Sequence, residues 1–478
     1  MTVRWFARAS LRAFAASLVV LGVGSAAAAA SPAAPAGPPA GPGSQLWVSG
    51  YSGPFNGYNV ATAIATSPDG KVVFATGRSE GANATVDYAT VAYDSGSGAQ
   101  LWASRFTRLG GGIPQAIAVS PDGSTVYVTG QAAGAQSLDY MTIAYDAVTG
   151  AQRWASRYSG PSNSFDVATS LAVSPDGRTV YVTGYSGKIG GYDYVTIAYS
   201  AATGARVWMS RYNGRAGGND QARALAVSPD GRTVYVTGRS QGRTSGYDVA
   251  TVAYNAATGA QQWVSRYNGP ANLNDFGTGV AVGPRGQVVY VTGGSRAPSA
   301  QLGWVTVAYK ASTGRALWTR RSAGWYVING VGSSIGVTPN GQSVLVADYT
   351  AGTTTRTAYQ TTAYNARTGA LRWSRRYAGP AGNNDNLPSA LGISPDGTTV
   401  YVTGTSDNPA SESDYATVAY QIGTGARLWV SRFTGLGNSF DEANGLAVNP
   451  KGGAVYVTGS SAVGSTQYDF ATVAYRAG

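Results

Sequence analysis

The side chains available for chemistry in this sequence are carboxylates, arginines, tyrosines and a few lysines, because the chain contains neither histidine nor cysteine. Their absence excludes Ser-His-Asp and Cys-His catalytic arrangements and every thiol nucleophile. It also excludes disulfides, so a large buried core has to stabilise the fold. Any catalysis would rest on the remaining acids and bases or on a bound cofactor.

An aspartate and an arginine recur 18 residues apart in five of the repeats described below. On two strands joined by a tight turn, this spacing predicts residues directly opposed on one face of a sheet. Because the relation repeats, we interpret it as structural rather than catalytic. The five pairs are Asp87 with Arg105, Asp139 with Arg157, Asp193 with Arg211, Asp248 with Arg266, and Asp414 with Arg432.

The relation fails in two consecutive repeats, where Gly303 and Ala358 replace the acid. A ligand that binds once to a chain of similar units needs a place where the units differ. Aromatic side chains gather in this sector, and exposed aromatics beside free arginines can stack on a sugar or hold an acidic group. The alternative is that these are degenerate repeats whose aromatics fill packing gaps. The residues we expect to line a ligand-binding depression are Trp304, Trp325, Tyr326, Asp348, Arg321 and Arg376.

Two further motifs carry oxygen ligands. The repeated Ser-Pro-Asp-Gly segments occur in most repeats, so we interpret them as hairpin turns rather than as cation or phosphate loops. The segment Asn383-Asn384-Asp385-Asn386 is the best candidate for a Ca²⁺ site, because Ca²⁺ prefers carboxylate and amide oxygens. Loop capping is the alternative, and metal binding stays open.

Positioning these residues requires the repeats themselves. Eight prolines and eight tryptophans recur together, with successive prolines 53 to 56 residues apart. This period indicates a repeat architecture with eight units. The prolines are Pro68, Pro121, Pro175, Pro229, Pro284, Pro339, Pro395 and Pro450, and the tryptophans are Trp47, Trp102, Trp154, Trp208, Trp263, Trp318, Trp373 and Trp429.

Each unit predicts four β-strands. In the third unit, residues 166–212, short runs rich in Val, Tyr, Thr and Ile alternate with Pro-Asp-Gly and Thr-Gly turns, and no helical period of useful length occurs. Four antiparallel strands repeated radially make a propeller. We therefore predict an all-β, eight-bladed β-propeller over residues 42–478.

The two ends of the propeller segment predict how the ring closes. The last repeat stops after its third strand at Tyr475, whereas Gln45-Leu46-Trp47 matches the start of a fourth strand elsewhere. We therefore expect residues 45–50 to pair with about 470–476 and complete the eighth blade, which removes the open sheet edges. In such blades the long, variable loops all emerge on one face, where we expect binding to occur.

The chain resembles known propeller families over this whole segment. Ala144-Tyr145-Asp146 followed by Thr149-Gly150 and Trp154 is similar to the tryptophan-docking motif of quinoprotein propellers of the PQQ type. The stretches 174–184 and 228–238 resemble the secreted bacterial propeller repeats called SBBP and YVTN. In quinoprotein dehydrogenases the resemblance would imply a quinone over a tryptophan floor, a vicinal disulfide, Ca²⁺ and a catalytic aspartate. No residues here match that site, so we expect no cofactor.

The N-terminal residues predict export. Residues 1–30 carry Arg4, Arg8 and Arg12, an apolar run from Ala13 to Val23, and small residues ending at Ala30, the pattern of a cleaved signal peptide. Residues 31–41 form a Pro/Ala/Gly-rich linker. Without a lipobox cysteine or a C-terminal anchor, we expect a secreted protein with no stable membrane anchor.

Charge leaves the partner open. The chain carries a formal charge of +11, and the three signal arginines reduce this to 11 − 3 = +8 on the mature chain. An acidic partner is therefore conceivable, but the basic residues form no run interleaved with aromatics, so we expect no nucleic acid.

We expect a monomeric, non-enzymatic propeller that binds a glycan or a protein. The alternatives are a propeller enzyme, either a glycan lyase or hydrolase with paired carboxylates or a quinoprotein-like dehydrogenase, and a structural envelope scaffold.

Overall fold

The structure, a computed structural model, describes residues 41–478 with short gaps. The gaps are 83–84, 108–110, 135–136, 162–163, 298–301, 323–333, 352–356, 381–384, 409–410, 436–439 and 465–466. The predicted signal peptide and linker up to residue 40 lie outside the described residues. Within the described part, no helix is long and apolar enough to cross a membrane.

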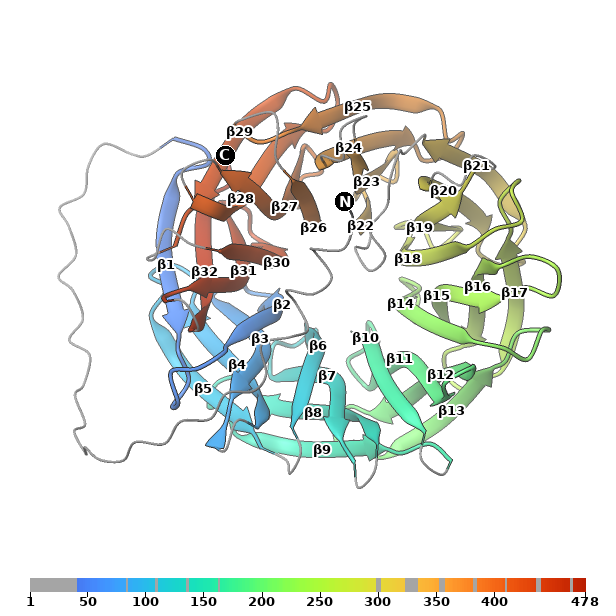
Figure 1. Ribbon diagram of the computed structural model, residues 1–478, viewed down its shortest axis with the longest axis horizontal. Coiled ribbons are helices and arrows are strands. Elements are labelled where there is room, and N and C mark those ends of the chain that lie inside the picture. Colours follow the sequence, from blue (N-terminus) through green and yellow to red (C-terminus); the bar gives the residue numbers. More distant parts are fainter. Residues whose placement is uncertain are drawn as a thin grey trace, which may run out of the picture. The chain divides into compact units, whose positions relative to one another are not determined.

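Eight four-stranded antiparallel sheets follow one another around a ring, which confirms the predicted all-β, eight-bladed propeller (Figure 1). In blades one to seven the strands are in chain order, from the centre of the ring to its rim. Blade one comprises β2 (Val60–Thr66), β3 (Val72–Glu80), β4 (Val86–Asp94) and β5 (Gln100–Phe106), and blade two comprises β6 (Gly112–Val119), β7 (Thr125–Ala133), β8 (Leu138–Asp146) and β9 (Gln152–Tyr158). Blade three comprises β10 (Phe165–Val173), β11 (Thr179–Lys188), β12 (Gly191–Ser200) and β13 (Arg206–Tyr212), and blade four comprises β14 (Asp220–Val227), β15 (Thr233–Gln241), β16 (Tyr247–Asn255) and β17 (Gln261–Tyr267). Blade five comprises β18 (Asp275–Val282), β19 (Val288–Arg296), β20 (Leu302–Lys310) and β21 (Ala316–Ser322), and blade six comprises β22 (Ser334–Val337), β23 (Ser343–Ala351), β24 (Thr357–Asn365) and β25 (Leu371–Tyr377). Blade seven comprises β26 (Asn386–Ile393), β27 (Thr399–Asn408), β28 (Ser411–Gln421) and β29 (Arg427–Phe433), and blade eight comprises β30 (Asp441–Val448), β31 (Ala454–Ala462), β32 (Tyr468–Arg476) and β1 (Gln45–Tyr51).

The eighth blade is built from both ends of the described chain, as predicted. Strand β1 pairs antiparallel with β32, with Trp47 opposite Ala474 and Gly50 opposite Ala471. Its sheet order is β1-β32-β31-β30, so β1 takes the rim position that β5 takes in blade one. Blade eight thus has four strands like the other blades, and β32 is paired on both of its edges.

The middle strands are buried on both sides because neighbouring blades cover both faces. In β11, Val180 and Val182 are fully buried, and so is Thr183 on the alternate face. A sheet covered on both faces favours continuous runs of β-branched and aromatic residues rather than alternating polar ones. The Val-Tyr-Val-Thr runs of the sequence therefore mark the core.

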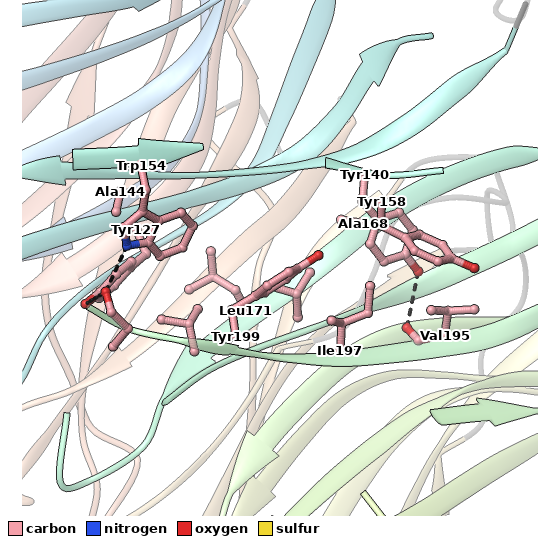
Figure 2. Packing of buried hydrophobic residues seen from close by; sticks show 13 residues of the cluster. Tyr127, Tyr140, Ala144, Trp154, Tyr158, Ala168, Leu171, Val195, Ile197 and Tyr199 are labelled. Carbon is pink, nitrogen blue, oxygen red and sulfur yellow. Dashed lines mark hydrogen bonds between the residues drawn. The ribbon is translucent and has the colours of Figure 1, made fainter. Parts of the chain in front are cut away.

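Docking tryptophans connect the blades near the rim. The Trp154 indole Nε1 donates a hydrogen bond to the Ala201 carbonyl of the next blade at 2.9 Å (Figure 2). The turn glycine Gly204 packs on this ring, since a Cβ there would lie 2.6 Å from the ring carbon Cδ2. Each blade donates in the same way to the next one around the ring, through Trp47, Trp102, Trp154, Trp208, Trp263, Trp318, Trp373 and Trp429.

Polar side chains connect the blades at the centre of the ring. In seven blades the inner strand carries a bulge, as between Ala61 and Ala63, and the bulged residue can reach the next blade. The bulged Thr62 hydroxyl donates to the Pro114 carbonyl at 2.8 Å. Asn444 Nδ2 donates to the Ala61 carbonyl at 3.0 Å and joins blade eight to blade one.

Candidate binding face

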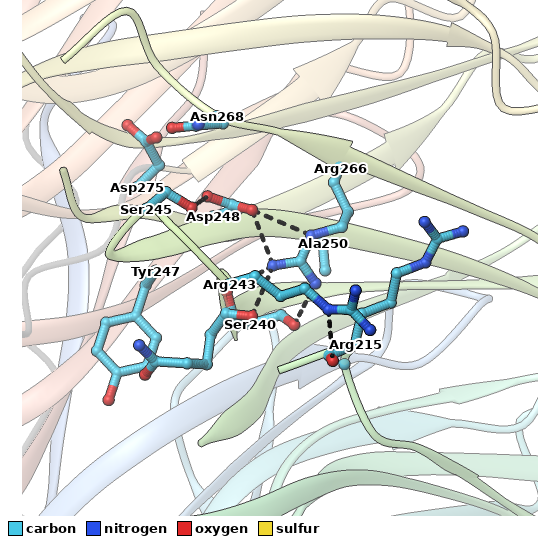
Figure 3. A network of polar contacts seen from close by, with 12 residues as sticks. Arg215, Ser240, Arg243, Ser245, Tyr247, Asp248, Ala250, Arg266, Asn268 and Asp275 are labelled. Carbon is cyan, nitrogen blue, oxygen red and sulfur yellow. Dashed lines mark hydrogen bonds and ion pairs between the residues drawn. The ribbon is translucent and has the colours of Figure 1, made fainter. Parts of the chain in front are cut away.

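In five of the eight blades, an arginine near the end of the rim strand organises one end of the blade. In blade four, Arg266 on β17 forms an ion pair with Asp248 on β16 at 2.8 Å (Figure 3). The same guanidinium donates to Ser240 Oγ on β15 at 2.5 Å. It also donates to the Tyr212 hydroxyl on β13 of the preceding blade at 3.0 Å. One side chain thus ties three strands of its own blade to the neighbouring blade.

The five predicted ion pairs all form, but their predicted register is wrong. Arg266 lies opposite Ala250, and Asp248 is the diagonal neighbour on the same face of the sheet. A five-residue turn, 256–260, and a bulge beside Trp263 shift the strands, and the long guanidinium side chain reaches the diagonal position. The other pairs are Asp87 with Arg105, Asp139 with Arg157, Asp193 with Arg211, and Asp414 with Arg432.

The carboxylates of these pairs are more buried than expected for a surface pair. The Asp414 side chain is fully buried and that of Asp248 is 9% exposed, whereas the arginines keep about a fifth of their surface in solvent. In the low dielectric between blades, an ion pair with complete hydrogen bonding is worth more than an exposed one. The pairs are therefore structural clamps at the blade ends.

Both sets of long loops emerge at this end. The connection 242–246 between β15 and β16 and the interblade connections 213–219 and 268–274 bond to one another, for example from Arg243 Nε to the Arg215 carbonyl at 3.1 Å. The N–H of Gly246 likewise donates to the Asn272 carbonyl. We call this end, formed by the loops after the second and fourth strands, the long-loop face. The opposite end, the short-turn face, carries the uniform turns such as 174–178 and 201–205.

Large apolar side chains are exposed on the long-loop face. They lie in its connections or at the first residue of an adjoining strand, in several blades. Ile189 has 82% of its surface exposed and Phe55 has 52%. Among the residues that the structure describes, they are Phe55, Tyr58, Phe165, Ile189, Leu273 and Val463. A surface on which exposed apolar side chains lie above polar, ion-paired residues is typical of a surface that binds another protein.

The short-turn face has two described depressions, which repeat the same turn. One, of about 650 Å³, is lined by Pro68, Asp122 and Val148, and the other, of about 290 Å³, by Pro175, Asp230 and Ala257. The turn aspartates serve their own turns, as predicted. Asp176 accepts a hydrogen bond from Ser174 Oγ at 2.5 Å, and this bond lowers the pKa of its carboxyl.

Blades five and six lack the ion pair, as the sequence predicts. Arg321 lies opposite Val305 and Arg376 opposite Gln360, and both side chains are exposed. Neither forms an ion pair with a described carboxylate; Arg321 donates to the Arg296 carbonyl at 3.3 Å. Ligand binding by these arginines stays a prediction.

Trp304 is not on the surface, and its predicted exposure is wrong. It is 2% exposed, and its Nε1 donates to the Tyr349 carbonyl of blade six at 2.7 Å. The same position holds Tyr140 and Tyr194 in blades two and three, whose hydroxyls also donate to a carbonyl of the next blade. Trp304 therefore fills an interblade position of the core, as the packing alternative proposed. Its place in the repeat, aligned with those tyrosines, is the signal that could have indicated this.

Asp348 is also buried, at 3% exposure, which contradicts its expected place in a surface depression. One of its carboxylate oxygens has no hydrogen-bond partner among the described residues, and burial raises the pKa of the carboxyl well above its usual range. In the other blades this position is glycine, because a Cβ would overlap the inner strand, as Gly238 would with Gln221. The first described pair between β22 and β23 is Ser334 opposite Ala347.

The remaining candidates are only partly described. Trp325 and Tyr326 lie outside the described residues, as do Asn383 and Asn384. Asp385 accepts a hydrogen bond from the Thr357 N–H at 3.0 Å, and Asn386 accepts one from Ser406 Oγ at 2.5 Å. These two residues of the candidate Ca²⁺ segment thus cap strand ends, and no cluster of three metal-ligating acids occurs among the described residues.

Sequence reasoning missed the site where blade eight departs from the others. Gly50 stands where the other rim strands have arginine, although blade eight keeps the acids Asp441 and Asp469. The ending Val-Ser-Gly-Tyr of β1, beside Val-Ser-Arg-Tyr at 264–267, is the signal that could have found it. Tyr58 and Tyr468 lie side by side next to this site, with ring centroids 4.9 Å apart.

Solved structures with the same architecture differ widely in sequence. BamB from Moraxella catarrhalis is 16% identical over 91% of this chain and 97% of that one, with a TM-score of 0.50. A quinohemoprotein alcohol dehydrogenase from Comamonas testosteroni is 14% identical over 91% of this chain and 76% of that one, with a TM-score of 0.58. Sqt1 from Chaetomium thermophilum, bound to the N-terminus of the ribosomal protein L10, is 15% identical over 88% of this chain and 98% of that one, with a TM-score of 0.56. Likeness at this level shows the fold alone.

A search of curated proteins finds no match. A family model does match, in two overlapping segments, residues 87–251 and 248–471, which together span most of the propeller. Its description is outer membrane protein assembly factor BamB, a family of PQQ-type propeller repeats. The repeat, the docking tryptophans and this match agree, and the chain belongs to the BamB-type propeller family.

Proposed function

We propose that this protein is an exported, non-catalytic propeller that binds a protein partner through its long-loop face. The observation that carries the proposal is the set of exposed apolar side chains on that face, above a base cross-linked by ion pairs. Loops of varied length on a rigid scaffold are where proteins usually place recognition. The short-turn face, in contrast, repeats the same turns around the ring.

The comparisons support protein binding in general. The family carries the name of an assembly factor, and one neighbour of the same fold has been crystallised with the N-terminus of another protein. A propeller that docks a peptide segment or an exposed loop of a partner fits both. Export rests on the basic, apolar and small-residue pattern of residues 1–30.

The electrostatics of the blade ends favours binding over catalysis. The repeated carboxylates are bound to guanidinium groups, as Asp248 is to Arg266. A carboxylate neutralised in this way is a poor nucleophile and a poor general acid, because the ion pair holds it ionised and shields it. These acids serve the scaffold, and the loops above them are free to recognise a partner.

The proposal can be tested by site-specific photo-crosslinking on the two faces. Ile189 on the long-loop face and Val148 on the short-turn face are each 82% exposed, so they form a matched pair. A photo-reactive phenylalanine analogue at 189 is expected to give a discrete crosslinked protein in the culture medium and envelope fractions of the source organism. The same analogue at 148 is expected to give none.

Two results would contradict the proposal. Crosslinking from 148 alone would place recognition on the other face, and the absence of adducts from 189 and from a second position, Leu273, would remove the protein partner. Binding of a purified glycan panel by the unmodified protein, in the absence of adducts, would identify a glycan as the ligand instead. Detection of the protein in the cell interior with residues 1–30 intact would refute export.

A further inference from the structure

Blade eight retains the acidic groups of the ion-pair clamp but lacks its cation. In blade four, Asp220, Ser240 and Asp248 face one another across three strands, and Arg266 completes the set. In blade eight, Asp441, Ser461 and Asp469 occupy the same register. The rim residue opposite Ala471, where the arginine would stand, is Gly50.

Asp441 is buried without a counter-ion among the described residues. Its side chain is 1% exposed, and no hydrogen bond of ordinary geometry from a described residue ends on either carboxylate oxygen, although the Ser461 side chain and the Ala462 backbone lie near it. In blades three, four and five, a loop glycine donates its N–H to the equivalent aspartate, as Gly214 does to Asp220 at 2.7 Å. A buried carboxylate without donors is costly, because the lost hydration is not replaced.

The position of the missing cation can be located from a neighbouring glycine. A Cβ on Gly214 would lie 2.8 Å from Asp220 Oδ1 and 3.2 Å from Arg266 Nη1. In blade one, a Cβ on Gly53 would lie 2.8 Å from Asn59 Oδ1 and 3.3 Å from Arg105 Nη1.

The equivalent glycine of blade eight gives the same frame. A Cβ on Gly435 would lie 2.5 Å from Asp441 Oδ1 and 2.8 Å from Oδ2. The acid is therefore in place, and the space that a guanidinium nitrogen fills in blades one and four faces it.

Among the described residues around this space, one side is exposed and another is aromatic. Gly50 is exposed, so the approach from the rim is not covered by a side chain of β1. Phe433 stands where blade six offers the Tyr377 hydroxyl to Arg432, so this wall presents an aromatic ring without a competing hydroxyl. Asp469 Oδ2 accepts a hydrogen bond from Ser52 Oγ at 2.8 Å, which holds the second carboxylate in position.

We propose that this space, bounded by Asp441, Ser461, Asp469 and Phe433, is a guanidinium-binding slot that takes an arginine side chain of the partner. The proposal deepens, and rests on, the protein-binding function proposed above. The guanidinium of the partner would restore the clamp that five other blades make with their own arginine. Its bidentate fork suits two carboxylates on β30 and β32, the strands that flank β31, better than the point charge of an ammonium group does.

A metal ion fits this space less well. Ca²⁺ takes six to eight oxygen ligands, and the described side chains here offer two carboxylates and one hydroxyl. Tyr58 and Tyr468, beside the slot on the long-loop face, would pack against residues that flank the arginine. The slot and the exposed rings thus form one recognition surface.

The experiment is a titration of the full protein with ethylguanidinium and with arginine amide, followed by saturation-transfer NMR and calorimetry. We expect saturable binding of both probes in the millimolar range. Asp441→Asn and Asp469→Asn should each weaken it at least tenfold. Gly50→Arg should abolish it, because the chain then supplies its own guanidinium; a Cβ at Gly50 would meet only the Phe470 carbonyl, at 3.5 Å.

The controls separate the slot from general cation binding and from misfolding. Gly50→Ala leaves the slot empty and should bind both probes as the parent does. A crystal structure of Gly50→Arg should show the new guanidinium against Asp469 as Arg266 lies against Asp248. Probe binding that survives in Gly50→Arg, a guanidinium placed elsewhere in that structure, or tighter binding of Ca²⁺ than of ethylguanidinium would each overturn the proposal.

The two proposals fail in different ways. If photo-crosslinking from position 189 continues unchanged in Gly50→Arg and the probes do not bind, the slot is refuted and partner binding stands. If the probes bind but no crosslinked partner appears from either loop position, the slot stands as a small-cation site, and the protein-binding function is refuted.

Discussion

At the scale of single residues, Arg266 at the end of blade four donates hydrogen bonds to its own blade and to the preceding one. Arg266 uses its donors on Asp248, on the Ser240 hydroxyl and carbonyl, and on the preceding blade. Removing it leaves the nearly buried carboxylate of Asp248 without its counter-ion. We expect Arg266→Ala to lower the free energy of unfolding by about 2 to 3 kcal/mol, less than for a fully buried pair because the guanidinium is partly solvated. Urea unfolding followed by circular dichroism measures it.

Arg321→Ala is the matched control. Arg321 occupies the same position in blade five and is exposed. Its diagonal neighbour is Gly303, so it has no acid to pair with there. Its removal is expected to change stability by no more than about 0.5 kcal/mol. Equal losses in the two variants would show that the clamp does not depend on the ion pair.

Asp441 gives a prediction of pH dependence. Burial and the nearby Asp414 carboxylate raise the pKa of Asp441 to about 7 in the folded state, from an ordinary value of 3.8. The folded state therefore binds the proton more tightly than the unfolded state does. The stabilisation from this group is complete below about pH 4 and is lost as the pH rises through 7.

Replacing the acid removes this loss. We expect Asp441→Asn to be more stable than the parent at pH 8, by about 1 to 4 kcal/mol, and nearly equal to it at pH 4. Urea is the denaturant of choice, because guanidinium would occupy the proposed slot. Parallel stability curves of the two proteins from pH 4 to pH 8 would disprove the raised pKa.

Much of the residue-level picture could be predicted from spacing, and some of it could not. The five ion pairs follow from the repeated 18-residue relation, but their diagonal register depends on a bulge that the sequence does not announce. Asp441 looked like the loop-capping acids before the first strand of other blades, so its missing counter-ion was not predicted. What distinguishes it is a glycine on a strand from the opposite end of the chain.

At the scale of strands, close approach between the first two strands of a blade explains one column of glycines. A Cβ on Gly404 of β27 would overlap the Leu387 carbonyl of β26 and lie 2.6 Å from Pro388 Cα. We expect Gly404→Ala to lower the melting temperature and to cost about 1 to 3 kcal/mol of unfolding free energy, because the inner strand has to move. Calorimetry provides both quantities.

The comparison variant is Gly423→Ala, in the turn 422–426 that precedes β29. No other atom lies within 4 Å of the position its Cβ would take. Its expected effect is within about 0.5 kcal/mol of zero. A loss as large as that of Gly404→Ala would mean that backbone freedom, rather than strand contact, selects glycine at position 404.

The same column explains why the sector of blades five and six was misjudged from sequence. Asp348 and Trp304 looked like additions to a surface because they break the repeat. Both sit on strands whose two faces are covered by neighbouring blades, so a departure from the repeat there changes the core. A residue that departs from the repeat can indicate a binding site only if its side chain is exposed to solvent. The repeat pattern alone does not show whether it is exposed.

At the scale of the whole molecule, the strand β1 is the part on which ring closure depends. Deleting residues 42–52 removes the partner of β32 and leaves its backbone N–H and C=O groups unpaired. We expect the shortened protein to form oligomers in size-exclusion chromatography with light scattering. Its β32 amides should also exchange hydrogen faster.

A peptide of residues 42–52 added in trans tests the cause. It should restore the monomer and the slow exchange of β32 by filling the vacant rim position. A shortened protein that stays monomeric with unchanged exchange would show that the ring closes through other contacts.

The architecture as a whole was predictable because every blade states the same pattern again. A single strand pattern predicts a strand only weakly, but the same pattern in eight aligned repeats predicts the fold well. The docking tryptophans also indicate where neighbouring blades meet. Recognition depends instead on what differs between the blades, and each difference occurs only once. The ring can therefore be read from the sequence, while its ligand cannot.

Ring closure also imposes a waiting time on biosynthesis. Strand β1 is made before every other described strand, and its partner Tyr475 follows Gln45 by 475 − 45 = 430 residues. At about 5 to 20 residues per second, roughly 20 to 90 s pass before the pair can meet. During this interval the nascent β1 carries Trp47 without an interface to receive it. The last strand synthesised thus sets the moment at which the molecule becomes a closed ring.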